Sequence, residues 1–488
     1  MKKRILSLLL ALVMITTLLP LGLYDTAWAA EVSETAEAAE VSETAEATEI
    51  ASGSCGAGGV EDSSVRWVLT DDGTMTISGT GAMSDKETPW RNFSSQINRV
   101  VIESGVTTVG SYAFSNCDHL TAAELPGTLT AIGDYAFAWS GIAEITIPDG
   151  VVTIGACAFW QTKLINVVIP DSVTTIEESA FRYCWDMKTL HLGSGLTTVE
   201  GYAFDRCKAA VTLSADNGAF VLEDNALLNA EKTRLIQYFD ALVGTDRAET
   251  YTIPTGVEEI CDGAFDNSDN LKTIVIPNTV QRIGQNAFDG CRRLERLDIP
   301  ASVTYIAPEA FFFVTCPITV AEGNTSYFDE NDVIYSTGKK LLLYAGAVEG
   351  AFQIPDGVEE IGAAAFSGAK LSDVTIPGSV TDIGRAAFFN CRQLQSVTLP
   401  GSVQSLGNQL FGYCNNLVEA TIGDGISVIP AMIFDNCTAL TSVSIPKTVT
   451  RIESSAFIGC DALETVHYAG SAEEWEAVTI EYNNEALD

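Results

Sequence analysis

The feature that most constrains this chain is a phrase that recurs at an interval of about 22 residues. Residues 280–297 read VQRIGQNAFDGCRRLERL and residues 449–466 read VTRIESSAFIGCDALETV, with nine positions in common. A phenylalanine at the centre marks each copy, and we call it the ruler phenylalanine. The ruler residues are Phe114, Phe137, Phe159, Phe181, Phe204, Phe265, Phe288, Phe311, Phe366, Phe388, Phe411, Phe434 and Phe457. Ten of their twelve intervals have this length, which is too long for helix or strand amphipathicity, so the pattern predicts stacked supersecondary units.

Each repeat contains two extended stretches and a turn. Residues 271–277 (LKTIVIP) alternate apolar and polar side chains and end at a proline, which predicts a short strand. A second extended run follows, as in SVTDI at 379–383, and the segment around the ruler phenylalanine predicts a turn or a single helical turn. One such coil cannot bury its apolar residues alone. We therefore expect a β-rich solenoid, a leucine-rich-repeat-like stack of about 13 coils.

Two intervals are more than twice as long as the others, from Phe204 to Phe265 and from Phe311 to Phe366, and their additional sequence is similar. Both insertions, at about 211–250 and 318–352, carry an asparagine (Asn217, Asn324) followed three residues later by an aromatic residue. Two apolar stretches around a turn then follow in each. We expect a β-hairpin that elaborates one coil. Such a hairpin serves as a protruding spacer or as a contact surface, and the sequence leaves both readings open.

Both ends of the stack need a cap over their apolar edges. We expect a hairpin cap at 55–105, the solenoid at 106–466 and a C-terminal cap at 467–488. In the first cap, Val65, Trp67 and Leu69 share one face ahead of an Asp72-Gly73 turn, and Met75 and Ile77 follow on the next strand. In the second cap, the aromatic cover is expected from Tyr468, Trp475 and Tyr482.

The N-terminal residues are typical of an exported protein. Residues 1–30 combine a basic start, an apolar run and a small-residue cleavage site, which predicts a signal peptide cleaved after Ala29 or Ala30. Residues 31–54 carry glutamate at every third position from Glu31 to Glu49, which predicts a disordered acidic tether. No later stretch reaches about 18 apolar residues, so we expect no membrane span in the mature chain. The expected location is secreted or extracellular, with cell-surface association as an alternative.

The formal net charge of −37 excludes one class of partner. Binding to nucleic acid needs a dense positive surface, and this chain has 27 Lys and Arg residues against 64 Asp and Glu residues. We expect the partners to be extracellular or surface proteins.

The repeats carry a family resemblance. GTMTISGTGAM at 73–83, the IPxxVTxIGxxAFxxC repeats and YAGSAEEWEAVTI at 468–480 resemble the BspA-like leucine-rich repeat family of secreted and surface bacterial proteins. The resemblance implies a repeat solenoid and attachment to host or bacterial surfaces. It also implies binding of matrix proteins such as fibronectin and fibrinogen.

The cysteines and histidines argue against a catalytic or metal centre. Eight of the twelve cysteines lie three residues after a ruler phenylalanine, where serine, threonine, valine or alanine stands in other coils. We expect free thiols in the core, with disulfides between neighbouring coils as the alternative. The three histidines, His119, His191 and His467, lie in separate coils. We therefore expect no enzyme, no cofactor and no metal site.

The candidate ligand-binding residues lie on the surface. Each strand that ends in Ile-Pro places one residue outward, most often threonine, and His191, Asp298 and His467 depart from that background. Phe312 and Phe313, beside an insertion, form a candidate apolar patch. A threonine-rich strip is also ordinary sheet surface. We expect a non-catalytic adhesion protein, and the alternative is a structural spacer without a soluble ligand.

Overall fold

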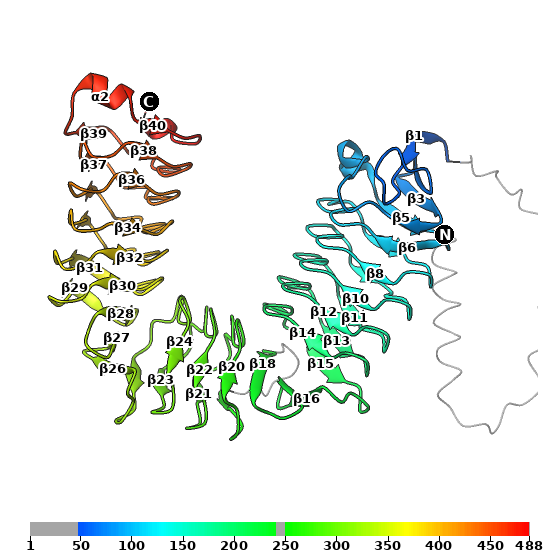
Figure 1. Ribbon diagram of the computed structural model, residues 1–488, viewed down its shortest axis with the longest axis horizontal. Helices are drawn as coiled ribbons and strands as arrows, with labels where there is room; N and C mark the ends of the chain where they lie inside the picture. Colours follow the sequence, from blue (N-terminus) through cyan, green and yellow to red (C-terminus); the bar gives the residue numbers. More distant parts are fainter. Residues whose placement is uncertain (1–46, 241–248, 488) are drawn as a thin grey trace, which may run out of the picture. The chain divides into compact units, whose positions relative to one another are not determined.

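The computed structural model describes residues 47–240 and 249–487, and the chain from Thr48 onward forms one compact unit. Within it the chain winds as a parallel β-solenoid of about 17 turns with almost no helix. Figure 1 shows the coils following one another in sequence order, from β3 near the blue end to β40 at the red end. This confirms the predicted fold class. The predicted signal peptide, and the predicted tether as far as residue 46, lie outside the described residues.

The strands that end at the Ile-Pro positions form one side of the coils, which we call row A. Row A consists of β3 (Thr74–Gly79), β5 (Arg99–Ile102), β7 (Ala122–Glu124), β9 (Glu144–Ile145), β11 (Asn166–Val168), β13 (Thr189–Leu192), β15 (Ala210–Leu213), β19 (Thr250–Thr252), β21 (Thr273–Val275), β23 (Arg296–Ile299), β25 (Ile318–Val320), β29 (Glu349–Gln353), β31 (Lys370–Thr375), β33 (Ser396–Thr398), β35 (Glu419–Thr421), β37 (Ser442–Ile445) and β39 (Thr465–Tyr468). Neighbouring strands pair in parallel at equal repeat offsets, as Leu190 does with Val211.

A second set of short strands, which we call row B, follows the proline turns. Row B consists of β4 (Gly81–Ala82), β6 (Val106–Val109), β8 (Ala131–Ile132), β10 (Thr153–Ile154), β12 (Thr175–Ile176), β14 (Thr198–Val199), β18 (Arg234–Tyr238), β20 (Glu259–Ile260), β22 (Arg282–Ile283), β24 (Tyr305–Ile306), β28 (Leu341–Tyr344), β30 (Glu360–Ile361), β32 (Asp382–Ile383), β34 (Ser405–Leu406), β36 (Val428–Ile429), β38 (Arg451–Ile452) and β40 (Thr479–Ile480). These strands also pair in parallel, for example Ile283 with Ile306.

The ruler phenylalanines stack into a ladder inside the coils. Ring centroids of successive ruler residues lie 4.9 to 5.9 Å apart wherever two coils follow directly. The prediction of about 13 coils was too low, because it counted only coils that contain a ruler phenylalanine. Other aromatic residues take that place in three further coils, namely Trp90, the Tyr238-Phe239 pair and Tyr344. The C-terminal turn around β39 and β40 adds another coil.

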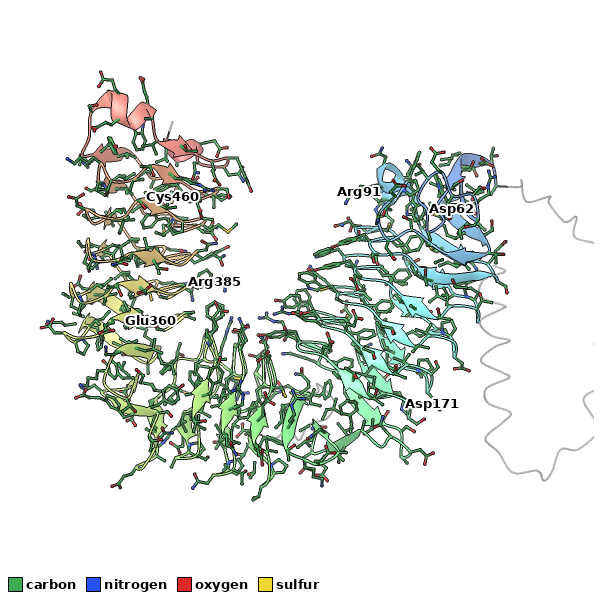
Figure 2. All side chains as sticks on the ribbon, viewed as in Figure 1. Asp62, Arg91, Asp171, Glu360, Arg385 and Cys460 are labelled. Atoms are coloured by element: carbon green, nitrogen blue, oxygen red, sulfur yellow. The ribbon has the colours of Figure 1, made fainter. Side chains whose placement is uncertain are left out.

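The cysteines form a second ladder, and all twelve are free. In seven coils the thiol donates a hydrogen bond of 3.0 to 3.2 Å to the carbonyl oxygen of the ruler phenylalanine in the previous coil, as Cys184 does to Phe159 O. Cys460, which Figure 2 labels, is one of these and is 2% exposed. Burial raises the pKa of thiols such as Cys291 well above the ordinary value. The prediction of free core thiols is confirmed, and their position is set by a hydrogen bond as well as by packing.

The segments around the ruler phenylalanines form the third side of each coil, which we call the turn layer. In most of these segments the residues two before and two after the ruler adopt a positive φ, as Ala386 and Asn390 do around Phe388. The amide of the later residue donates to the next coil, for example Asn390 N–H to Gly412 O at 2.7 Å. The turn layer is therefore bonded from coil to coil, although it contains no regular strand among the described residues.

The insertions differ from the predicted hairpins. Each is a three-stranded antiparallel meander whose last strand enters row B. The first consists of β16 (Phe220–Glu223), β17 (Ala226–Asn229) and β18, and the second of β26 (Tyr327–Glu330), β27 (Val333–Ser336) and β28. A pair of positive-φ residues makes the first turn of each, Asp224-Asn225 and Asn331-Asp332. The strand that the prediction missed is the first one, β16 or β26, which starts at the aromatic residue three positions after the asparagine and pairs with the strand that directly follows it.

Asn217 and Asn324, which the sequence singled out, anchor the two insertions in the same way. The side-chain amide of Asn217 donates to Gly193 O and Leu196 O at 2.9 and 3.0 Å, and its oxygen accepts from two backbone amides. Asn324 makes the same four bonds, with Pro300 O and Val303 O as its acceptors. The two insertions are therefore structural equivalents.

The predicted caps are present with two corrections. The hairpin of β2 (Val65–Thr70) and β3 is paired as expected, but β1 (Glu49–Ser54) adds an antiparallel strand, so the predicted tether does not extend to residue 54. A 3-10 turn, η1 (Arg91–Gln96), follows this cap. At the other end lie α2 (Ala472–Glu476) and η2 (Glu485–Leu487). Tyr468 and Trp475 pack with ring centroids 5.1 Å apart, whereas Tyr482 is 72% exposed and covers nothing, contrary to the prediction.

Candidate functional site

The insertions interrupt the turn layer at two places. We call the contact between the coils of Phe204 and Phe265 the first junction, and that between the coils of Phe311 and Phe366 the second junction. At both junctions, the residue two positions before the last ruler phenylalanine ahead of the insertion contacts the second coil after the insertion. The Tyr202 hydroxyl donates to Gln285 O at 3.2 Å, and Glu309 pairs with Arg385 at 2.7 Å. The two junctions thus share one geometry.

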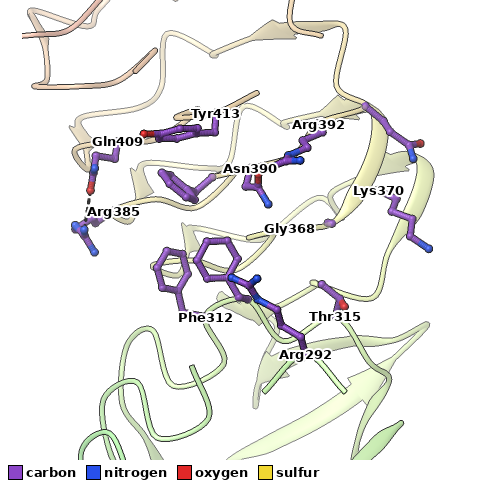
Figure 3. Close-up of a pocket in the computed structure, with 14 residues that line it drawn as sticks. Arg292, Phe312, Thr315, Gly368, Lys370, Arg385, Asn390, Arg392, Gln409 and Tyr413 are labelled. Carbon is purple, nitrogen blue, oxygen red and sulfur yellow. Dashed lines mark hydrogen bonds between the residues drawn. The ribbon is translucent and has the colours of Figure 1, made fainter. Parts of the chain in front are cut away.

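The second junction gathers four aromatic rings that line a pocket (Figure 3). Phe312 and Phe313 stack with centroids 4.4 Å apart, and Phe389 lies 5.7 and 5.8 Å from them. Tyr413 continues the cluster at 5.4 Å from Phe389. Phe312 and Phe313 are half-buried and Tyr413 is 39% exposed. The predicted apolar patch is therefore part of a larger aromatic cluster, and its role in binding a ligand stays a prediction.

These rings line an open groove of about 780 Å³. Four cationic side chains also line it, Arg292, Lys370, Arg385 and Arg392, together with Thr315, Gly368, Ala369 and three amide side chains. No aspartate or glutamate is among the lining residues. In a chain of net charge −37, this groove is a local reversal of charge.

Two of the four cations have carboxylate partners. Arg385 binds Glu309, which is 9% exposed, and also donates to Gln409 Oε1 at 2.6 Å. Lys370 pairs with Glu349 at 2.6 Å. Arg292 instead lies over the Phe313 ring at 5.2 Å, and Arg392 donates to Asn390 Oδ1 at 2.8 Å. Among the described residues no carboxylate lies within ion-pair distance of these two arginines, and both are exposed.

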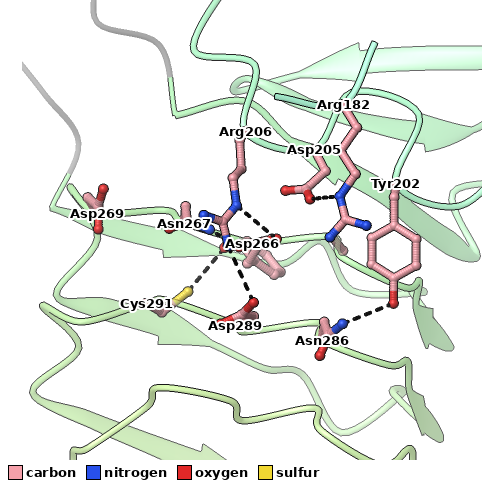
Figure 4. Close-up of polar contacts among 12 residues, drawn as sticks. Arg182, Tyr202, Asp205, Arg206, Asp266, Asn267, Asp269, Asn286, Asp289 and Cys291 are labelled. Carbon is pink, nitrogen blue, oxygen red and sulfur yellow. Dashed lines mark hydrogen bonds and ion pairs between the residues drawn. The ribbon is translucent and has the colours of Figure 1, made fainter. Parts of the chain in front are cut away.

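The first junction carries a buried ionic network instead of an aromatic groove (Figure 4). Arg182 Nε donates to Asp205 at 2.6 Å, and Arg206 lies 3.7 Å from Asp266 and 3.6 Å from Asp289. The side chains of Asp205 and Asp266 are fully buried and that of Asp289 is 7% exposed. Three carboxyl groups therefore share two guanidinium groups.

This crowding shifts the protonation of two carboxyl groups. Burial, reinforced by Asp205 and Asp289, raises the pKa of Asp266 to about 10. Burial also raises the pKa of Asp289 to about 7, although Arg206 opposes the shift. At neutral pH Asp266 is therefore protonated, and Asp289 titrates near neutrality.

The three sheet-surface candidates are not brought together. His191 lies on β13, Asp298 on β23 and His467 on β39, which belong to three different sheets of row A. His191 Nδ1 shares a hydrogen bond with Thr212 Oγ1 at 2.9 Å, and Asp298 accepts from Thr319 Oγ1 and Arg296 Nε at 2.5 Å. His191 and Asp298 are therefore hydrogen-bonded to neighbouring residues on the surface of the sheet. The assignment of all three as ligand-binding residues stays a prediction.

The cations and Phe389 of the groove were missed by sequence reasoning. Arg292, Lys370 and Arg392 each lie four residues after a ruler phenylalanine. An alignment of the coils by this offset shows five cations, because Lys163 and Lys208 share the position, so the offset by itself does not single out the groove. The alignment also does not show that the coils of Phe311 and Phe388 meet, because that contact depends on how the insertion closes.

The repeat itself decides the family. The BspA type leucine rich repeat region matches in six copies, over residues 91–211, 240–331 and 351–484. The chain belongs to the BspA-type leucine-rich repeat family. Proteins of this family are typically secreted or held at the cell surface.

Several solved leucine-rich repeat structures are similar to this BspA-type chain. A leucine rich cell surface protein from Faecalibacterium prausnitzii is 27% identical, with 86% of this chain and 96% of that chain covered and a TM-score of 0.48. A leucine-rich repeat protein from Eubacterium ventriosum is 22% identical over 86% and 85%, with a TM-score of 0.32. The pneumococcal vaccine antigen PcpA is 17% identical over 87% and 96%, with a TM-score of 0.31. No curated protein matches the chain.

Two features are absent from the described part of this BspA-type chain. No group of three His, Cys, Asp or Glu side chains at 47–240 and 249–487 has the arrangement of a metal site. Over the same residues, no helix has the length and apolar character needed to cross a membrane.

Proposed function

We propose that this chain is an exported, non-catalytic adhesion protein that binds proteins on host tissue, extracellular matrix or other bacteria. The observation that carries the proposal is the open groove at the second junction. Aromatic side chains that stay accessible beside arginines are the residue types that contribute most to binding energy at protein interfaces. A solenoid that needed only to be a spacer would have no reason to keep Phe312, Phe313 and Tyr413 accessible.

The sheet surface supports the same proposal less directly. The outward residues of row A are all exposed or half-buried, so they are accessible to a partner. Among the threonines of that surface, an imidazole or a carboxylate would then be offered to the partner at His191, Asp298 and His467. Because these residues lie far apart in the stack, each would contribute to a broad interface and not to one pocket.

Export is part of the proposal. Residues 1–30 have the composition of a signal peptide, and the family is typically secreted or surface-located. N-terminal sequencing of the protein recovered from its host's culture medium or cell surface tests this step. A first residue of Ala30 or Glu31 is the expected result, and an intact N-terminus in the cytoplasm would contradict it.

The binding experiment uses the full-length chain, produced with its own N-terminus so that processing takes place. The chain is applied to immobilised extracellular-matrix proteins and glycans at low and high salt. Saturable binding to a protein target that weakens but remains detectable at high salt is expected, because salt screens the exposed arginines but hardly affects the aromatic contacts. Failure to bind any protein target would overturn adhesion and favour the spacer alternative.

A further inference from the structure

The groove at the second junction carries an inference about ligand chemistry, which rests on the proposed function because it concerns the same surface. We propose that the groove binds a short acidic segment of a partner protein, with two or more carboxylates beside an aromatic or aliphatic side chain. The carboxylates would meet Arg292 and Arg392, and the apolar side chain would pack on Phe312, Phe313 and Phe389.

The charge of the groove selects an anionic ligand. Lys370 and Arg385 already bind Glu349 and Glu309, whereas neither Arg292 nor Arg392 forms an ion pair among the described residues, although Asp289 interacts with Arg292 at longer range. A guanidinium group binds a carboxylate through two parallel hydrogen bonds, which are charge-assisted and directional. The two arginines come from coils on opposite sides of the second insertion and line the same groove. An extended segment with several carboxylates can reach both.

The floor of the groove selects a peptide over a sugar. Phe312, Phe313 and Phe389 present ring faces, and an apolar side chain gains free energy by covering them. Sugar hydroxyl groups need acceptors, but no carboxylate lines the groove. Of the three amide side chains that line the groove, Asn390 and Gln409 already accept through their oxygens from Arg392 and Arg385. An acidic peptide pairs with the arginine donors and covers the rings, and its backbone N–H groups can bind water because the groove is open.

A glycine keeps the floor of the groove open. Gly368 has a φ of +76°, and a Cβ there would lie 3.3 Å from Thr315 Cγ2 and 3.9 Å from Phe313 Cδ1. Asparagine occupies this offset with a positive φ in other coils, for example Asn390 and Asn436. Gly368→Asn is therefore compatible with the backbone while it places a side chain in the groove.

The test uses isothermal titration calorimetry with the full-length chain and synthetic pentapeptides that are acetylated and amidated. The probe is Asp-Glu-Phe-Glu-Asp. Asn-Gln-Phe-Gln-Asn removes its charge, and Asp-Glu-Ala-Glu-Asp removes its ring. Measurable binding is expected for the probe, with an affinity at least about tenfold above either control peptide. Equal binding of the neutral peptide, or no binding of the probe, would overturn the inference.

Matched variants locate the site. The double variant Arg292→Gln/Arg392→Gln breaks no ion pair of the folded chain. It should weaken probe binding at least about tenfold. Gly368→Asn should do the same by obstruction. Lys447→Gln removes an exposed cation elsewhere, and Gly357→Asn makes the glycine change at another positive-φ position outside the groove, where a Cβ would meet nothing within 4 Å. Both controls should bind the probe as the unmodified chain does. Thermal unfolding of each variant shows that the fold persists.

The outcomes separate this inference from the proposed function. If the chain binds a matrix protein and the double variant and Gly368→Asn bind it equally well, the groove is not the site, although adhesion stands. If polygalacturonate, an anionic glycan, binds in the groove and the peptide does not, the assigned partner class is wrong. If peptide and matrix proteins both fail to bind, both proposals fall.

Discussion

The two junctions have one geometry and opposite chemistry. At the first, Arg206 lies among Asp266, Asp289 and Asp205 in a buried network, with its guanidinium 4.9 Å from the Tyr183 ring centre. At the second, the equivalent position is Phe313, and the space beyond it is an open groove. Arg206 and Phe313 both lie two residues after a ruler phenylalanine and just before an insertion.

This difference shows how a repeat scaffold acquires a site. The insertions break the regular turn layer at the same point of the coil, so each junction must be closed by side chains. At the first junction, arginine and aspartate side chains fill the gap and pair with one another. Aromatic rings line the second and leave two arginines unmatched among the described residues. The solenoid therefore supplies two equivalent gaps, and substitution of a few turn-layer residues determines which gap is filled and which stays open to a ligand.

The largest expected effect comes from breaking the first junction. Arg206→Met leaves Asp289 buried without its cation and removes the contact with the protonated Asp266, so we expect a loss of about 3 kcal/mol in unfolding free energy. At the equivalent position, Phe313→Ala removes a half-buried ring and should cost about 1–2 kcal/mol. Urea denaturation gives both values, and hydrogen exchange at 262–289 locates the first. Equal losses would show that the two junctions do not differ as described.

The insertion anchors should be equally important at both junctions. Asn217→Ala and Asn324→Ala each remove four hydrogen bonds to backbone groups, and we expect losses of about 2–3 kcal/mol from each. Asn278→Ala, at an exposed position, serves as the control and should change little. Hydrogen exchange in strands β16–β18 and β26–β28 reports the local opening. A loss at only one insertion would break their equivalence.

Protonation should affect only the first junction. The folded-state pKa values of Asp266 and Asp289 are raised, so the folded chain binds more protons than the unfolded chain above about pH 4. Stability should therefore fall as pH rises, and between pH 5 and 8 the Asp289 share is about 2.5 kcal/mol. Denaturation of Asp289→Asn at the two pH values should show a shallower fall. An unchanged slope would place Asp289 outside the network.

The smallest expected effect on stability is that of the free arginines at the second junction. Arg292→Gln removes an exposed cation that has no carboxylate partner among the described residues, so unfolding free energy should change by no more than about 0.5 kcal/mol. The same method and buffer as for Arg206→Met make the comparison direct. A loss above about 2 kcal/mol would mean that Arg292 has a structural role resembling that of Arg206.

Much of the fold was predictable because it is local and repeated. The spacing of the ruler phenylalanines implied the solenoid, and strand alternation implied the inward and outward faces of row A. The constant offset of the cysteines implied a core ladder, and Asn217 and Asn324 marked the insertions as equivalents. The coil count was less predictable because Trp90 and Tyr344 take the place of a ruler phenylalanine, and only stacking reveals that.

The candidate site was predictable only in part. Phe312 and Phe313 stood out as consecutive aromatics beside an insertion, but Phe389 lies beyond that insertion and one further coil in the sequence. The repeat sequence around Phe388 has no feature that predicts a contact between this coil and Phe313. Similarly, the first insertion and a whole coil separate Arg206 from Asp289 in the sequence, and no pattern links the two.

The sequence by itself determined the repeating coil. Each coil buries the same small set of residues against neighbouring coils of the same kind, so every coil adopts the same conformation. Only the tertiary structure decided what happens where the repetition stops. At the two insertions, the path of the chain brings the coil before the insertion against the second coil beyond it. The contacts made there depend on long-range packing, and it is this packing that buries one junction and leaves the other as an aromatic and cationic groove.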